Sequence, residues 1–227
     1  MVKDFKDYFV KSFYKEYLVK DVRNISKKGN AVVVFILESP HTDEIRKKHP
    51  LAGNSGKAVS KLFDEKEPIG ALIKDSLVKN VAIVNVCNIP MNISAYKCSD
   101  LEKLNCFKLI LLNWLRKTIG TDKKAIDNNF KDCNEEKREM IEKIVDDMKR
   151  RLCKLQSNLK TKQIVVVPCG NVATAFWKKV VCKNNSVSVI EDIPHPSRNQ
   201  WTEKVLKKLK ENNVIKEGIL LNKELKT

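Results

Sequence analysis

Four continuous apolar runs divide the chain, and longer segments with polar faces separate them. The runs span residues 31–37, 81–87, 163–169 and 187–193. They are rich in β-branched residues, which is typical of strands buried on both faces of a parallel sheet. Strands that alternate with helices predict a sheet covered on both sides, with right-handed crossovers. We therefore expect an α/β fold, a three-layer α/β/α domain over residues 1–227 with a four-stranded parallel sheet.

The segments between the runs have the spacing of amphipathic helices. The predicted helices cover residues 4–27, a stretch ending near 63, two helices within 98–160, residues 171–180, and a C-terminal helix that Thr202 caps. The segment 98–160 is the most charged part of the chain, with a loop expected at 120–134.

The net charge of +16 gives the first indication of function. Basic residues are spread along the chain, and a surface of this kind attracts polyanions. We expect a nucleic acid as the partner. General lysine enrichment explains the same composition and stays open as the alternative.

Other features exclude several classes of protein. No stretch approaches the roughly 20 apolar residues of a membrane helix, and Met1-Val2-Lys3-Asp4-Phe5 has no apolar signal region. The seven cysteines are odd in number and contain no C-x-x-C pair. We expect a cytoplasmic monomer with reduced cysteines, no membrane contact, no metal and no cofactor.

Chemistry-bearing residues follow the strands. In parallel sheets the ligand site lies beyond the carboxyl ends of the strands. Glu38 directly follows the first apolar run, where an unpaired charge is costly. His195 follows the last run between two prolines, and Asn85 interrupts the second run with an amide that needs a partner. An N-cap or salt-bridge role for Glu38 and a satisfied core histidine are the alternatives, but together the residues predict a catalytic cleft.

Two other patterns give weaker evidence for a binding site. Gly53-x-x-Gly56-Lys57 lacks the spacing and hydroxyl of a P-loop. It leaves either backbone N–H groups suited to an anion or a plain helix-initiating turn. A polar cluster lies in the next loop, but it lacks a metal-binding motif; its members are His41, Asp43, Glu44 and His49.

Five segments, taken in order, resemble the uracil-DNA glycosylase superfamily. Phe35-Ile36-Leu37-Glu38-Ser39-Pro40-His41 is similar to G-E-A-P-G of its thermostable bacterial branch and to G-Q-D-P-Y-H of its best-known branch. Pro50-Leu51-Ala52-Gly53-Asn54-Ser55-Gly56-Lys57 resembles P-F-x-G-x-A-G-K. The segments 84–92 and 166–173 resemble T-N-V-V-K-C-R-P-P-x-N and the L-G-x-x-A turn, and His195-Pro196-Ser197 matches H-P-S.

The resemblance implies a DNA glycosylase that removes uracil or another deaminated base in base excision repair. It also implies DNA as the partner, single-stranded or as a damaged duplex. Glu38 would activate the attacking water, and His195 would stabilise the departing base. Asn85 would hydrogen-bond the flipped base. The resemblance also implies further contacts to the base from Ser39, His41, Leu51 and Ser197. For contacts to DNA it implies Lys57, Arg198, Asn199, Gln200 and Trp201.

The chain departs from the family at three of these positions. Leu51 stands where the family has a stacking phenylalanine, and Ser39 stands where the best-known branch has its catalytic aspartate. His41 replaces a residue that helps to decide which pyrimidine fits. The alternatives are a non-catalytic nucleic-acid-binding protein that retains the fold, and a hydrolase of free nucleosides or nucleotides. The cluster cysteines of the bacterial branch are absent upstream of Cys87. The segment 98–160 is longer than the usual connection of the family, which implies a helical insertion within the domain and a surface for a protein partner.

Overall fold

The chain forms an α/β structure around a five-stranded sheet of order β1-β3-β2-β4-β5. The computed structural model describes residues 4–27, 31–102, 107–121, 134–159, 163–180, 187–213 and 215–216. The strands are β1 (Val22–Asn24), β2 (Ala31–Leu37), β3 (Val81–Asn85), β4 (Gln163–Pro168) and β5 (Val187–Val189). Strands β3, β2, β4 and β5 pair in parallel, as predicted, whereas β1 pairs antiparallel with β3.

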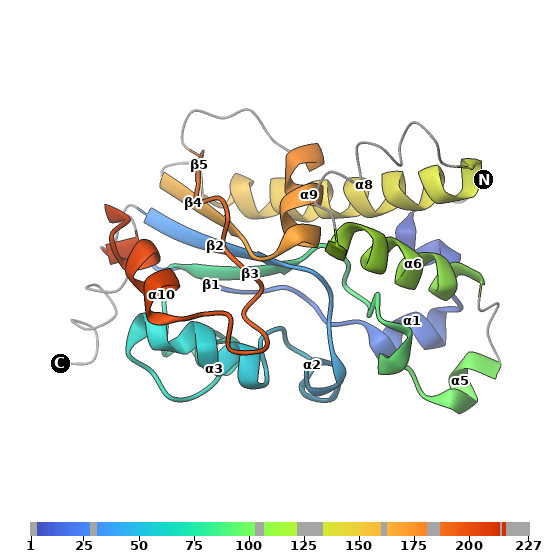
Figure 1. Cartoon of the computed structure of the whole chain (residues 1–227), viewed down its shortest axis with the longest axis horizontal. Helices are drawn as coiled ribbons and strands as arrows, with labels where there is room; N and C mark the ends of the chain where they lie inside the picture. Colours follow the sequence, from blue (N-terminus) through green and yellow to red (C-terminus); the bar gives the residue numbers. More distant parts are fainter. Residues whose placement is uncertain are drawn as a thin grey trace.

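Helices cover both faces of the sheet (Figure 1). The α-helices are α1 (Lys11–Tyr17), α2 (Thr42–Lys47), α3 (Asn54–Ser60), α4 (Ile69–Lys74), α5 (Cys98–Glu102), α6 (Phe107–Thr121), α8 (Glu135–Ser157), α9 (Asn171–Val180) and α10 (Glu203–Lys210). Short 3₁₀ helices cover Phe5–Tyr8, Lys61–Phe63 and Ile93–Ala95.

The side chains of β2 explain why the sheet has two covered faces. All seven of its residues are buried, and successive side chains point to opposite faces. Val32, Val34 and Ile36 pack with apolar residues of α1, α6, α8 and α9. Val33, Phe35 and Leu37 pack with those of α3, α4 and α10.

The N-terminal prediction is wrong in part. Residues 4–27 were expected to form one helix, but a 3₁₀ helix and α1 are followed by the edge strand β1. The four-stranded sheet is corrected to five strands for the same reason. Aromatic residues at near-helical spacing still pack together, since Phe13 and Tyr17 are buried with centroids 4.8 Å apart.

The segment 98–160 supplies much of the layer on one face of the sheet. Met140, Ile144, Met148 and Leu152 of α8 are buried, which confirms the predicted apolar stripe. Residues of α6 and α8 belong to the same core cluster as β2. A protein partner for this segment stays a prediction, and most of the loop expected at 120–134 lies outside the described residues.

The described cysteines differ in burial. Cys87 and Cys169 are buried, as expected for small apolar side chains, whereas Cys98 and Cys153 are exposed. Among the residues that the structure describes, no helix combines the length and apolar character that a bilayer span requires.

Candidate catalytic site at the strand ends

The carboxyl ends of the parallel strands meet at one edge of the sheet. The Cys87 N–H donates to the Glu38 carbonyl at 3.1 Å, and the Cys169 N–H donates to the Ile36 carbonyl at 2.8 Å. A bridge between Cys169 and Ile193 carries the pairing into the segment before His195. The four predicted strand ends therefore lie side by side, as the topology required.

Glu38 forms an ion pair with Arg116 of α6. The Arg116 Nε donates to Glu38 Oε1, and the two side chains are 34% and 19% exposed. Burial raises the pKa of the Glu38 carboxyl, and the charge of Arg116 opposes that rise. The carboxylate thus stays close to the surface with a cationic partner, which confirms the salt-bridge interpretation without excluding a second role.

Sequence reasoning missed Arg116. The signal was its position on the apolar side of α6, four residues after Leu112 and three before Ile119, both of which are buried. Residues at these spacings share one helix face. A charged residue on a buried face needs a partner, and Glu38 is the partner that it finds.

His195 has a defined tautomer. The Ser197 N–H donates to His195 Nδ1 at 3.3 Å, and Ser197 Oγ lies 2.9 Å from the same atom. Since Nδ1 accepts a hydrogen bond from the backbone, this hydrogen-bond pattern assigns the ring proton to Nε2. Burial and the nearby charges of Arg116 and His41 lower the pKa of His195 to about 4. The imidazole is therefore neutral near pH 7 and carries a hydrogen-bond donor at Nε2.

Gly170, which follows the end of β4, allows the backbone to pass close to His195. Gly170 has φ +88°, and a Cβ there would lie 3.0 Å from the Cβ of His195. The Gly170 N–H also donates to the Ile193 carbonyl at 2.8 Å. Glycine at the end of β4 thus brings the two strand ends into close contact.

Glu44 ties two loops of the site together. Its carboxylate accepts the N–H of His41 at 2.8 Å and also the N–H of Leu51. Burial raises the pKa of Glu44 to about 7. Leu51 is buried at φ +51°, a conformation that a leucine rarely adopts, so this loop holds local backbone strain. His41 is exposed at the rim.

Ser39 joins the ends of β2 and β3. Its Oγ accepts the Met91 N–H at 3.1 Å, and its side chain also hydrogen-bonds to Glu38. Ser39 therefore links Glu38 to the loop that follows β3.

Asn85 carries an amide with unmet hydrogen-bonding capacity. The residue is 0% exposed, and neither Oδ1 nor Nδ2 has a partner among the described residues. Strand alternation puts its side chain on the same face as Val81 and Ile83, in the cluster that also contains Leu37 and Leu51. Buried amides are normally hydrogen-bonded, so this one is suited to a ligand.

An exposed turn follows His195. Arg198 and Asn199 have φ values of 54° and 56°, and with Gln200 they are exposed. This part of the chain crosses the front of the molecule between β5 and α10 (Figure 1). Successive left-handed residues are uncommon outside glycine, so the turn presents these side chains in a defined conformation.

Trp201 is buried, whereas a contact to DNA would require an exposed side chain. It is 4% exposed, its Nε1 donates to the Pro194 carbonyl at 2.8 Å, and its ring lies 6.0 Å from that of Phe35. The indole therefore closes the 194–201 loop against the core. We correct its role from contacting a duplex to anchoring the turn that Arg198 to Gln200 form.

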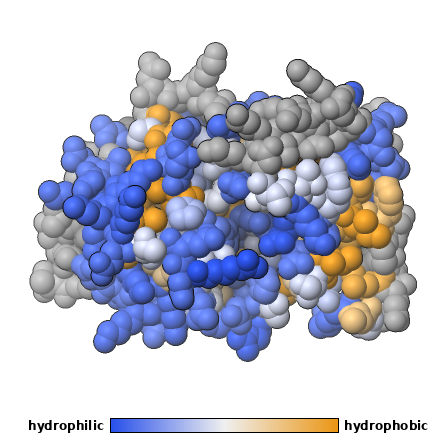
Figure 2. Space-filling view, viewed as in Figure 1, coloured by the Kyte–Doolittle hydropathy of each residue, from blue (hydrophilic) through white to orange (hydrophobic). Residues whose placement is uncertain are grey.

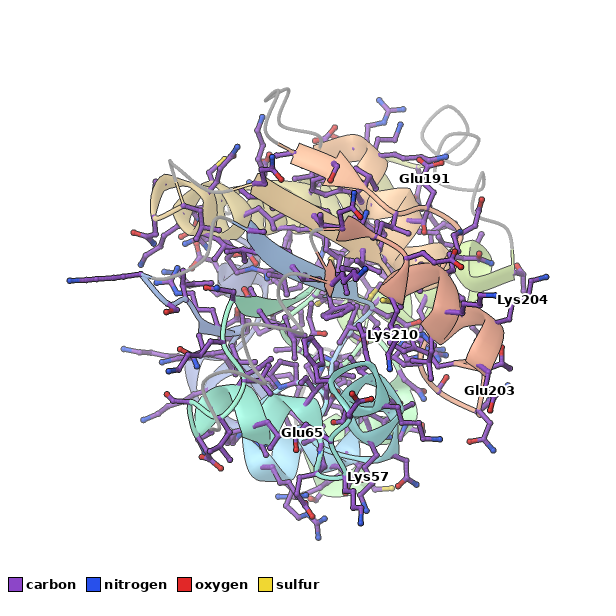
Figure 3. The ribbon with its side chains drawn as sticks, turned by 90° about the vertical axis from the view of Figure 1, so that its left-hand side faces the viewer. Lys57, Glu65, Glu191, Glu203, Lys204 and Lys210 are labelled. Carbon is purple, nitrogen blue, oxygen red and sulfur yellow. The ribbon has the colours of Figure 1, made fainter. Side chains whose placement is uncertain are left out.

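The glycines near Lys57 are explained by packing. A Cβ on Gly56 would lie 1.9 Å from the Leu51 carbonyl oxygen, so the close approach of two backbones requires glycine there. Lys57 itself is exposed on α3 and points away from the sheet, on the side that also displays Lys204 and Lys210 of α10 (Figure 3). The helix-initiating interpretation therefore accounts for this motif.

The polar cluster near His41 has internal partners. Asp43 pairs with Arg46, Glu44 accepts two backbone N–H groups, and His49 Nδ1 lies 3.2 Å from the Pro50 carbonyl. Within the described part of the chain, no three residues with ligating side chains gather as a metal site would require. Figure 2 shows a mainly hydrophilic surface between apolar areas at its left and right.

Arg116 and His41 act electrostatically on both Glu38 and His195, so the structure brings these four residues into one site. A carboxylate, a neutral imidazole and an unpaired amide at one sheet edge suit the binding and cleavage of a neutral polar ligand. No protein-family model matches the chain, and no curated protein matches it.

Proposed function

We propose that this chain is a DNA glycosylase of the uracil-DNA glycosylase superfamily that hydrolyses the N-glycosidic bond of uracil or another deaminated base. The observation that carries the proposal is that Arg116, which forms an ion pair with the partly buried Glu38, also acts electrostatically on a neutral His195. The ordered sequence motifs support the same assignment. Hydrolysis of this bond needs one group for water and another for the leaving base.

His195 acts on the leaving base. As the glycosidic bond breaks, its electron pair passes to the base, which leaves as an anion. The Nε2–H of a neutral imidazole donates a hydrogen bond to the oxygen where this charge develops, without first giving up a proton. Preorganised donors of this kind typically contribute about 10²- to 10³-fold to the rate.

Glu38 acts on the water. Its ionised carboxylate accepts a proton as the water oxygen bonds to C1′ of the sugar, and its charge stabilises the oxocarbenium-like sugar. Arg116 favours the ionised form against the effect of burial. General base catalysis of this kind contributes about 10²- to 10⁴-fold.

Asn85 and the exposed turn bind the substrate. The unpaired amide of Asn85 offers one acceptor and one donor to the edge of a flipped base. Arg198, Asn199 and Gln200 lie directly after the His195 loop, where they can contact the strand that carries that base. Extraction of the base costs a few kcal/mol, which contacts to the strand offset. The net charge of +16 favours the approach of DNA.

The test is cleavage of defined duplexes. Duplexes that contain uracil, hypoxanthine or xanthine are incubated with the protein, and alkali then breaks the strand at abasic sites. We expect breaks with the wild-type protein, a loss of about 10²-fold or more in Glu38→Gln and His195→Asn, and no loss in the exposed control Asp64→Asn. Absence of breaks with all three duplexes would refute the proposal.

A second function is favoured by the Arg116–Glu38 ion pair. A carboxylate that is already engaged suits a binding module that retains the fold without turnover. This alternative predicts no strand breaks but retained DNA binding, with an affinity that falls steeply as salt rises. It also predicts that Glu38→Gln leaves DNA affinity unchanged.

A further inference from the structure

A buried arginine of α8 reaches the end of β3. Arg151 Nη2 donates to the Asn85 carbonyl at 2.8 Å and to the Val86 carbonyl at 2.9 Å. Its side chain is 14% exposed. The guanidinium therefore fixes the carbonyl side of the residue whose amide has no partner.

Asp21 fixes the other side of Asn85. Its Oδ1 accepts the Asn85 N–H at 3.2 Å, and its carboxylate accepts two hydrogen bonds from Arg151 Nη1 at 3.0 and 2.8 Å. Asp147 completes the network by accepting from Arg151 Nε at 2.8 Å. We call these three residues the Arg151 network.

The network replaces a missing strand neighbour. Strand β1 pairs with β3 only as far as Val22 opposite Ile83. Beyond that point the outer edge of β3 would lack partners for its backbone groups, which need them when buried. Side chains from α8 and from the residue before β1 supply those partners at Asn85.

We propose that Arg151, held by Asp21 and Asp147, is a positioning residue that aims the Asn85 amide at a base edge carrying a hydrogen-bond donor next to an acceptor. Uracil, hypoxanthine and xanthine carry such an edge. The proposal rests on the proposed function and names the part of the protein that sets base recognition. Both backbone groups of Asn85 are held, so the Cα–Cβ direction is fixed while the amide stays available.

The test observes the Asn85 amide directly. In ¹⁵N-labelled protein, the Asn85 side-chain signals are identified by their loss in Asn85→Leu. Free uracil, hypoxanthine and xanthine are then titrated in turn. We expect at least one base to shift these signals in the wild-type protein. In Arg151→Lys, which keeps the charge but loses the fork of donors, binding of that base weakens about tenfold or more.

Arg150→Lys is the matched control. Arg150 neighbours Arg151 and pairs with Asp147 at 2.5 Å, but its side chain is 64% exposed. We expect this variant to bind the base as the wild type does. Asp21→Asn is the second test variant, because it keeps an acceptor for the Asn85 N–H and loses the charge that holds Arg151. It should weaken binding less than Arg151→Lys does.

The outcomes separate this proposal from the glycosylase activity. Base binding that weakens in Arg151→Lys, without strand cleavage by the wild type, would support the positioning role and refute the activity. Cleavage by the wild type with unchanged base binding in Arg151→Lys would support the activity and refute the positioning role. The proposal also fails if no base shifts the Asn85 signals, or if Arg151→Lys and Asp21→Asn both fail to fold while Arg150→Lys folds.

Discussion

Arg151 and Arg116 come from the two contacting helices α8 and α6 on one face of the sheet, but their surroundings differ. Arg151 is 14% exposed and donates to two carboxylates and two backbone carbonyls. Arg116 is 34% exposed and pairs with Glu38. Its positive charge also lowers the pKa of His195, because a nearby cation disfavours protonation of the imidazole.

The difference separates the Arg151 network from the site that we propose to be reactive. At the end of β3, the guanidinium of Arg151 is satisfied by two carboxylates and two backbone carbonyls, and the backbone of Asn85 is held in place while its amide stays unpaired. After the end of β2 and after the bridge at Ile193, burial displaces the pKa values of Glu38 and His195. Burial also raises the pKa of Asp21 in the Arg151 network, so the two networks differ in the partners of their arginines and not in pKa displacement alone.

The largest contrast should appear in stability. Removing Arg151 leaves Asp21 and Asp147 without their buried partner, so Arg151→Ala should lower the free energy of unfolding by about 3–5 kcal/mol. Arg116→Ala should lower it by about 1 kcal/mol, because Glu38 can reach water. Urea denaturation of both variants measures the difference, and equal losses would contradict it.

The loop that carries His195 gives the next test. Trp201→Ala removes a buried ring and its hydrogen bond to Pro194, so stability should fall by about 3–5 kcal/mol. The matched variant is Trp114→Ala, since Trp114 is only half-buried and packs under Lys137. A smaller loss is expected there. A Trp201→Ala protein as stable as the wild type would restore the assignment of Trp201 to DNA contact.

A smaller effect is expected from Glu44 and depends on pH. Its pKa is raised from 4.5 to about 7 in the folded protein, so the folded state holds a proton that the unfolded state has lost. This contribution to stability is present below pH 4.5 and is lost as pH rises through 7. Between pH 5 and pH 8, Glu44→Gln should therefore gain stability relative to the wild type, on the order of 2 kcal/mol.

Urea denaturation at the two pH values measures this change. Glu67→Gln, at an exposed position, is the control and should show no such trend. A relative stability of Glu44→Gln that does not change with pH would show that the carboxyl is already ionised at pH 5.

The parallel strands could be predicted because burial on both faces leaves a plain signal. Ala31–Leu37 was predicted at its observed bounds. The predicted fourth run shortens to Val187–Val189, since the polar residues that follow leave the sheet before the bridge at Ile193. The meeting of the strand ends at the candidate site followed from the same reasoning, because parallel strands end at one edge.

Long-range partners could not be predicted. The edge strand Val22–Asn24 has only three residues and adjoins an aromatic segment with helical spacing, so local pattern favoured a helix. Arg116 is one of many basic residues until the fold brings α6 to Glu38. Trp201 stands among polar residues, and only the position of Phe35 explains its burial.

The most direct test of the account is the pH dependence of base release from duplexes containing uracil, hypoxanthine or xanthine, measured under single-turnover conditions. We predict a rate that rises from acid pH as Glu38 ionises and stays level to pH 8, since His195 is neutral above about pH 4. In Arg116→Gln the rise should move to higher pH, because Arg116 holds the pKa of Glu38 down. A rate that falls between pH 6 and pH 8 would require a protonated His195, and no release at any pH would contradict the proposed activity.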